Sequence, residues 1–168
     1  TQTLVVDAQT ISFGDAELPS TLAYGSDPIT FTVSSSAGGP VTVGLAPGSS
    51  QYCRLTGTGP TYTLAAFAPG TCTLVASAGG TIIYAEVTVT QDIEIVKGAQ
   101  TIVFNALADK TYGDPPSTVS ATGGATGNPV TFSSQTAGVC TVTGNVVTIL
   151  AGGTCTIAAN QAANANYN

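Results

Sequence analysis

Cysteine is the residue type in this chain with the clearest chemistry. Cys53, Cys72, Cys140 and Cys155 are its four cysteines, and the chain contains no histidine. Structural zinc sites use closely spaced Cys-x-x-Cys pairs or histidine ligands, and neither is present. Four cysteines permit three disulfide pairings. We therefore predict disulfide bonds and no transition-metal site.

The other reactive side chains are too sparse for catalysis. Without histidine, and without a serine in a Gly-x-Ser-x-Gly context, a hydroxyl nucleophile has no obvious base. The nine carboxylates are scattered, and none forms a convincing acid–base pair. A calcium site would draw on Asp92, Glu94, Asp109 and Asp114, but the chain has no Asp-x-Asp-x-Asp-Gly loop. We therefore expect solvated carboxylates, no catalytic residue, no cofactor and no enzymatic activity.

The chain is one sequence written twice. Ala-Gln-Thr-Ile occurs at residues 8–11 and 99–102, and Gly-Thr-Cys-Thr at 70–73 and 153–156. A period of roughly 85 residues predicts two small domains, residues 8–98 and 99–168, preceded by a strand at residues 1–7. Each copy contains two cysteines at matching positions, so repeat symmetry selects the pairs Cys53–Cys72 and Cys140–Cys155. Each bridge should contribute about 3 kcal/mol to stability.

Composition limits the class of protein. Charged residues make up 7% of the chain, hydrophobic residues make up 43%, and the net charge is −6 with only three cations. Nucleic acid binding needs basic residues to neutralise phosphates, and no apolar run approaches the roughly 18 residues that span a bilayer. Disulfides imply export to an oxidising compartment. These features indicate an extracellular protein that neither binds nucleic acid nor inserts into a membrane.

Short alternating segments separated by glycine and proline indicate β-strands throughout. The longest alternation places Val87, Val89, Ile93 and Ile95 on one face of a strand. About seven short strands per copy are typical of an immunoglobulin-like sandwich.

Tyrosine–glycine pairs occur at matching turns of the two copies, Tyr24-Gly25 and Tyr112-Gly113. We interpret them as structural, because glycine permits a positive φ and tyrosine can bury its ring while its hydroxyl bonds to backbone. Direct stacking of a ligand on these tyrosines is the alternative.

Five segments of the second copy follow the pattern of a known family of repeats, namely Gln100–Phe104, Lys110–Pro115, Pro129–Ser133, Val139–Val142 and Gly153–Ala158. In these segments the second copy resembles the bacterial Ig-like repeats called MBG domains of the YGX type. The first copy matches more loosely. The resemblance implies tandem Ig-like domains in arrays of secreted and surface-anchored proteins, where such repeats act as spacers, adhesive modules and assembly elements.

The two copies differ at their ends. After Tyr84 the first copy continues through the strand-like segment 87–96, whereas only one residue follows the matching Tyr167. Residues 1–7, directly ahead of the first Ala-Gln-Thr-Ile, resemble residues 90–95 with the following connection shortened by two residues. The sequence thus predicts an all-β chain of two tandem Ig-like β-sandwich domains. The second domain lacks its last strand, and the N-terminus has a spare one.

We therefore predict that residues 1–7 are a polymerisation strand, formed by Thr3, Leu4, Val5, Val6 and Asp7. They should pair with the second domain of a neighbouring subunit and not with their own first domain. Leu4 and Val6 would point inward, in the places of Ile93 and Ile95. Identical subunits would then assemble head to tail into a pilus-like surface fibre. The alternative is a segment of a long single-chain adhesin or stalk of tandem repeats. That segment would bind carbohydrate or protein ligands on host or neighbouring cells.

Overall fold

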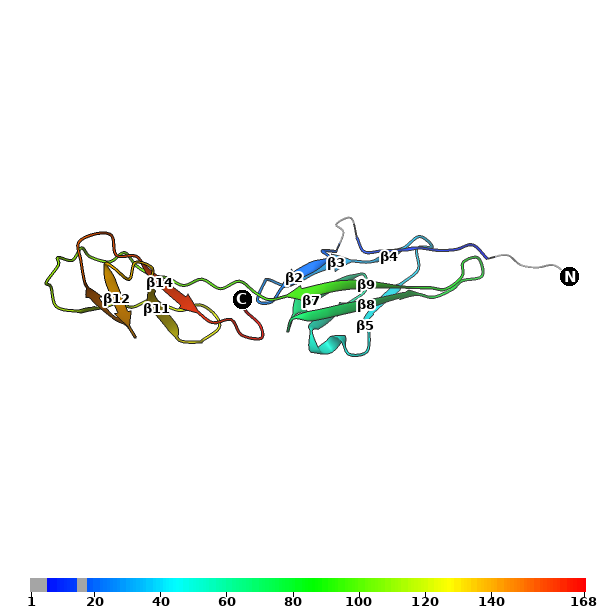
Figure 1. Ribbon diagram of the computed structural model, residues 1–168. Helices are drawn as coiled ribbons and strands as arrows, with labels where there is room; N and C mark the ends of the chain where they lie inside the picture. Colours follow the sequence, from blue (N-terminus) through cyan, green and yellow to red (C-terminus); the bar gives the residue numbers. More distant parts are fainter. Residues whose placement is uncertain (1–5, 15–17) are drawn as a thin grey trace. The chain divides into compact units, whose positions relative to one another are not determined.

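The computed structural model describes residues 6–14 and 18–168, which form two compact units, Thr1–Gly98 and Ala99–Asn168 (Figure 1). Regular structure in the described residues is all β, apart from one 3-10 turn at Ser49–Gln51. The all-β prediction is confirmed. The division falls where the second copy of the repeat begins.

The first unit contains two main sheets. A four-stranded sheet has the order β2-β9-β8-β5, and a three-stranded sheet has the order β3-β7-β6. Strands β1 and β4 form a further, two-stranded antiparallel sheet. The strands are β1 (Ile11–Ser12), β2 (Thr21–Ala23), β3 (Ile29–Thr32), β4 (Ser34–Ser35), β5 (Val41–Leu45), β6 (Cys53–Thr58), β7 (Thr61–Ala66), β8 (Gly70–Ala78) and β9 (Val87–Val96).

Strand β9 is the segment that alternation predicted, and it is central to its sheet. It pairs antiparallel with β8 and parallel with β2. Ile93 and Ile95 are fully buried, whereas Asp92 and Glu94 on the other face are exposed. The period of two places the apolar row on the core side and the charged row in solvent.

The core of the first unit joins its two sheets. Buried side chains from β8 and β9, among them Leu74 and Ile93, belong to the same cluster as Phe31 of β3 and Leu64 of β7. Fourteen buried residues make up this cluster in the described part of the unit. Two sheets therefore share one core.

The second unit repeats this arrangement with fewer strands. Its described strands are β10 (Ser117–Thr118), β11 (Val130–Ser134), β12 (Cys140–Thr143), β13 (Val146–Ile149) and β14 (Ile157–Gln161). They form a three-stranded sheet, β10-β13-β12, and a two-stranded sheet, β11-β14. Its buried cluster contains Val119, Cys140 and Val147, with partly buried neighbours such as Phe132 and Ile157.

The strand registers of the two copies agree. Val41 of β5 lies opposite Ala78 of β8, and the matching Val130 of β11 lies opposite Gln161 of β14. Each ladder contains five consecutive pairs, counting this one. Because matching residues have matching partners, positions in the first unit can be compared directly with positions in the second.

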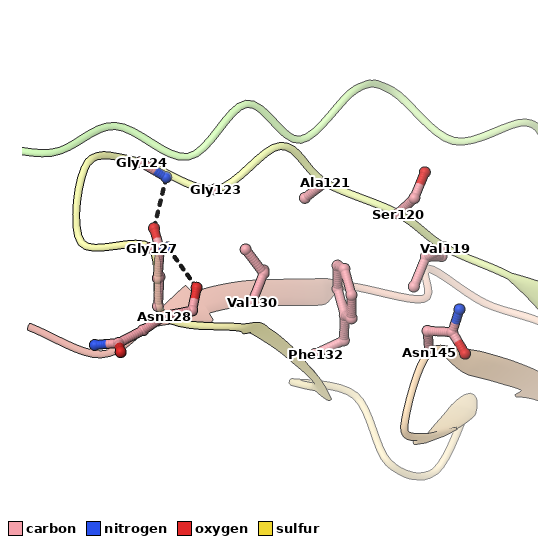
Figure 2. Close-up of a pocket in the computed structure, with 11 residues that line it drawn as sticks. Val119, Ser120, Ala121, Gly123, Gly124, Gly127, Asn128, Val130, Phe132 and Asn145 are labelled. Atoms are coloured by element: carbon pink, nitrogen blue, oxygen red, sulfur yellow. Dashed lines mark hydrogen bonds between the residues drawn. The ribbon is translucent and has the colours of Figure 1, made fainter.

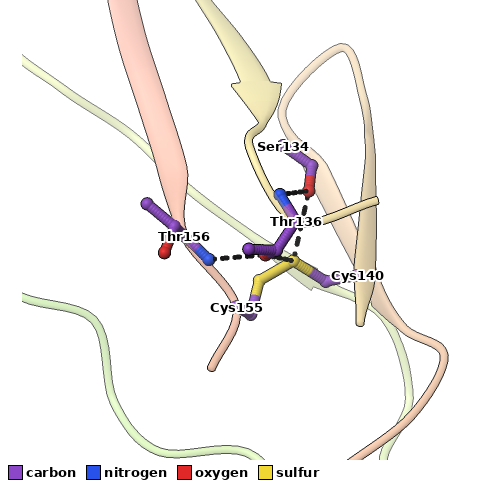
Figure 3. The surroundings of a disulfide bond; sticks show 5 residues. All are labelled: Ser134, Thr136, Cys140, Cys155 and Thr156. Atoms are coloured by element: carbon purple, nitrogen blue, oxygen red, sulfur yellow. Dashed lines mark hydrogen bonds between the residues drawn. A yellow bond between two sulfur atoms is a disulfide. The ribbon is translucent and has the colours of Figure 1, made fainter. Parts of the chain in front are cut away.

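Both predicted disulfides are present. Cys53 is joined to Cys72 and Cys140 to Cys155, with Cα–Cα distances of 5.8 and 5.6 Å. Figure 3 shows the second bridge beside Ser134 and Thr136. Two disulfides are typical of an oxidising, extracellular environment.

Candidate functional site

In the first unit, strand β9 pairs antiparallel along one edge of β8. Ile93 lies opposite Cys72 and Ile95 lies opposite Gly70. Beside this strand, Cys72 and Leu74 of β8 are completely buried. The burial of this row of β8 thus depends on the two isoleucines that pack beside it.

The matching row of the second unit lines an open groove. Cys155 and Ile157 correspond to Cys72 and Leu74, but both are only half-buried and contact a groove of about 620 Å³. Val147, the counterpart of Leu64, also lines it. Val147, Cys155 and Ile157 belong to or pack against the buried cluster of the unit, so the groove reaches apolar side chains of the core. Its lining residues are Leu107, Ala108, Asp109, Lys110, Tyr112, Ser117, Thr118, Val119, Val139, Val147, Ile149, Ala151, Gly152, Gly153, Thr154, Cys155 and Ile157.

The flanks of the groove are the two segments that match the partners of β9. Residues 109–111 correspond to β2 but form no strand, and β14 begins at Ile157, although its counterpart β8 begins at Gly70. Among the strands of the described residues, β14 pairs with β11 alone. One edge of β14 and the non-strand segment 109–111 therefore flank the groove, and an added strand would pair with their backbone groups.

The tyrosine–glycine turns are partly as predicted. Gly25 and Gly113 have φ values of 79° and 98°, so glycine supplies the positive φ in both copies. Tyr24 is half-buried, but Tyr112 is 69% exposed. The expectation of a buried ring is wrong for Tyr112, because its ring lies against the open groove.

The prediction that residues 1–7 do not pair within the first unit is wrong at Asp7. Asp7 forms a parallel bridge with Tyr84; its N–H donates to Ile83 O at 2.7 Å and its carbonyl accepts from Ala85 N at 3.0 Å. Asp7 therefore belongs to the first unit, so the proposed polymerisation strand ends at Val6, one residue earlier than predicted. Val6 is 41% exposed. The predicted strand residues Thr3, Leu4 and Val5 lie outside the described residues.

Three of the four carboxylates considered for calcium accept hydrogen bonds from protein groups. Asp92 accepts a hydrogen bond from Thr73 Oγ1 at 2.6 Å, and Glu94 accepts one from Thr71 Oγ1 at 3.1 Å. Asp114 accepts from the Thr111 N–H at 2.9 Å. Across residues 6–14 and 18–168, no three His, Cys, Asp or Glu side chains are grouped to hold a metal ion. In the same ranges, no helix has the length and apolar character to cross a membrane.

A second hollow in this unit lies where a smaller side chain replaces a buried ring of the first unit (Figure 2). In the first unit the Tyr62 ring is buried, and its hydroxyl accepts from the Val43 N–H at 3.1 Å. The hairpin β12-β13 is shorter than β6-β7, and Asn145 stands at the position that matches Tyr62. Figure 2 shows Asn145 beside the hollow, where the Gly124 N–H donates to Gln161 Oε1 at 2.6 Å. We assign no ligand to this hollow.

No protein-family model matches the chain, and no curated protein matches it. The comparison that bears on the groove is therefore the internal one, between the two copies.

Residue types alone did not indicate the groove, although the repeat contains the necessary signal. Leu22, Cys72 and Leu74 surround β9 in the first unit. Reading their counterparts from the aligned copies gives Lys110, Cys155 and Ile157, and all three line the groove. The signal for the site thus lies in the residues that match the neighbours of β9, and not only in the missing strand itself.

Proposed function

We propose that the chain is a non-enzymatic extracellular structural subunit built of two tandem Ig-like β-sandwich domains of the MBG type. The shared core of the two sheets in the first unit, the repeated registers and the two disulfides support this class. In this proposal the subunits form a head-to-tail surface filament.

The groove of the second unit is the observation that carries the proposal. It lies between two segments whose counterparts both pair with β9, and its walls are the counterparts of side chains that β9 buries. An added strand would pair with backbone on both sides and fill apolar positions with alternate side chains. Strand addition of this kind is a recurring mode of protein recognition.

Residues Thr3–Val6 of an identical subunit are the proposed donor. Placed in the register of β9, Leu4 lies opposite Cys155, Val5 opposite Thr154 and Val6 opposite Gly153, running antiparallel to β14. Each buried side chain contributes roughly 1.5–3 kcal/mol and each ladder hydrogen bond about 1 kcal/mol. Asp7 follows directly and is held by its own first unit. The contact joins unlike surfaces, so it propagates as a filament.

The pairing of Asp7 also favours a second candidate. In a long single-chain adhesin or stalk, residues 1–7 would connect two successive domains of one polypeptide, and Asp7 would fix that connection to the domain it enters. The groove would then be filled by a later segment of the same polypeptide. The chemistry of the groove is the same in both candidates, and only the source of the strand differs.

A designed disulfide tests both the donor and its register. Thr71 and Glu94 lie directly opposite each other in the first unit, so Val5→Cys with Thr154→Cys should place two cysteines opposite each other across the subunit contact. We expect oxidation to give a ladder of covalent multimers in non-reducing gels, with the new bridge identified by peptide mapping.

The matched control for this experiment is Val5→Cys with Ala158→Cys. It moves the acceptor four residues along the chain, from Thr154 into β14, roughly 13 Å away, which is beyond the reach of a disulfide. Monomers alone from the first pair would overturn the filament proposal, and equal ladders from both pairs would overturn the register.

A further inference from the structure

The turn Thr81–Tyr84, here called the isoleucine turn, lies in the first unit just before β9. The Thr81 N–H donates to Tyr84 O at 2.8 Å. Thr81 Oγ1 accepts from the Ile83 N–H at 3.2 Å and from the Tyr84 N–H at 2.9 Å. One threonine side chain thus fixes the turn by local bonds.

The second unit builds the same turn at residues 164–167. The Asn164 N–H donates to Tyr167 O at 3.0 Å. Asn164 Oδ1 accepts from the N–H groups of Asn166 and Tyr167, both at 2.8 Å. The pattern of bonds is therefore repeated, with asparagine in the place of threonine.

The two turns differ in the side chains that they present. Ile82 and Ile83 are 85% and 56% exposed, and Ala165 and Asn166 take their places in the second unit. Since alanine and asparagine make the same turn, the fold does not require two isoleucines. Two adjacent exposed isoleucines that the turn itself does not need are available for contact with another surface.

The position of the isoleucine turn indicates its partner, and this step rests on the proposed function. The Asp7 N–H donates to Ile83 O at 2.7 Å, so the turn is bonded to the residue that directly follows the donor segment. With Val6 opposite Gly153 of another subunit, Asp7 lies about 3.3 Å further along the strand. The turn is thereby brought to the Gly153 end of that subunit's groove.

Exposed apolar side chains are present at that end of the groove. Tyr112 lines it and is 69% exposed, and Leu150 is 45% exposed, with its N–H donating to the carbonyl of the groove residue Val139. The connection is also short, since Asp7 alone separates Val6 from Ala8, whereas residues 96–98 separate Ile95 from Ala99. A shorter connection holds the two surfaces closer together.

We propose that Ile82 and Ile83 pack against Tyr112 and Leu150 of the next subunit, forming a second contact beside the donor strand. The strand alone would join the subunits through a single extended connection. The isoleucine contact adds apolar burial and limits rotation at the junction.

The test replaces the isoleucines by the residues of the matching turn, Ile82→Ala with Ile83→Asn. The turn and the fold of the first unit should be retained, because the same bonds form in the second copy. We expect filaments to assemble but to dissociate at roughly 10- to 100-fold higher subunit concentration, as the loss of two apolar contacts predicts. Concentration-dependent sedimentation measures this shift. Val103→Ala, at a 54% exposed position outside the groove, is the control and should cause no shift.

A double-mutant cycle with Tyr112→Ala and Leu150→Ala locates the partner surface. We expect the variant with all four substitutions to assemble no more weakly than the weaker of the two double variants, because both pairs of substitutions remove the same contact. Additive weakening would place the isoleucines elsewhere and overturn the inference. If the Ile82→Ala, Ile83→Asn variant dissociates at the native concentration, the isoleucine contact is overturned. If Val5→Cys with Thr154→Cys still gives disulfide ladders in that case, the filament proposal stays intact. Absence of those ladders would instead remove the filament proposal on which the inference rests.

Discussion

A chain with Leu4→Asp and Val6→Asp should remain monomeric where the native chain forms filaments. In the proposed register both side chains enter the positions of Ile93 and Ile95, which are 0% and 1% exposed in the first unit. Losing two apolar side chains from such positions removes about 3–6 kcal/mol, or roughly 10²–10⁴-fold in affinity. Burying the new carboxylates adds a further penalty. Electron microscopy and sedimentation velocity measure the outcome.

The first unit supplies a matched control for this variant. Thr3→Asp with Val5→Asp adds the same two charges one residue away, on the outer face of the proposed strand. The first unit carries Asp92 and Glu94 at the corresponding positions, and both are exposed. This control should assemble as the native chain does. Normal filaments from the Leu4→Asp and Val6→Asp chain would contradict the donor strand.

The repeat made much of the fold predictable. Because two copies contain two cysteines each, only one of three pairings keeps each bridge within its own copy, and that pairing is present. The alternation of Val87, Val89, Ile93 and Ile95 predicted β9, because apolar residues at every second position over ten residues indicate a half-buried β-strand. Glycine at the tyrosine–glycine turns predicted positive φ for the same local reason.

Features that depend on tertiary contacts were less predictable. Tyr112 matches Tyr24 in sequence, but its exposure depends on what packs over it, and the open groove leaves it 69% exposed. The bridge of Asp7 to Tyr84 joins residues far apart in the chain, and no local pattern at Asp7 indicates it. Ile82 and Ile83 resemble a strand in sequence, whereas the bonds to Thr81 Oγ1 place them in a turn. Periodicity indicates which face a residue occupies but not what covers that face.

Removal of the second disulfide should unfold the second unit and leave the first one folded. Cys140→Ala with Cys155→Ala removes a cross-link between residues 15 apart, which is worth about 3 kcal/mol. The second unit has three residues in its buried cluster in the part of the chain that the structure describes, and Cys140 is one of them. A small domain rarely has more than about 3–5 kcal/mol from its core. The loss of the bridge therefore takes most of its stability.

The other bridge provides the comparison that separates the cross-link from the core. Cys53→Ala with Cys72→Ala removes a bridge of similar loop length, 19 residues, from a unit with fourteen buried core residues in its described part. The first unit should then melt at a lower temperature but stay folded at 25 °C. Hydrogen exchange measured by mass spectrometry resolves the two units separately. Protection of residues 130–161 should be lost only in the Cys140→Ala, Cys155→Ala chain, and that chain should also fail to accept a donor strand, because its groove is built on the unfolded unit. Retained protection there would mean that strand pairing between β11 and β14 suffices without the bridge, and that the groove does not depend on it.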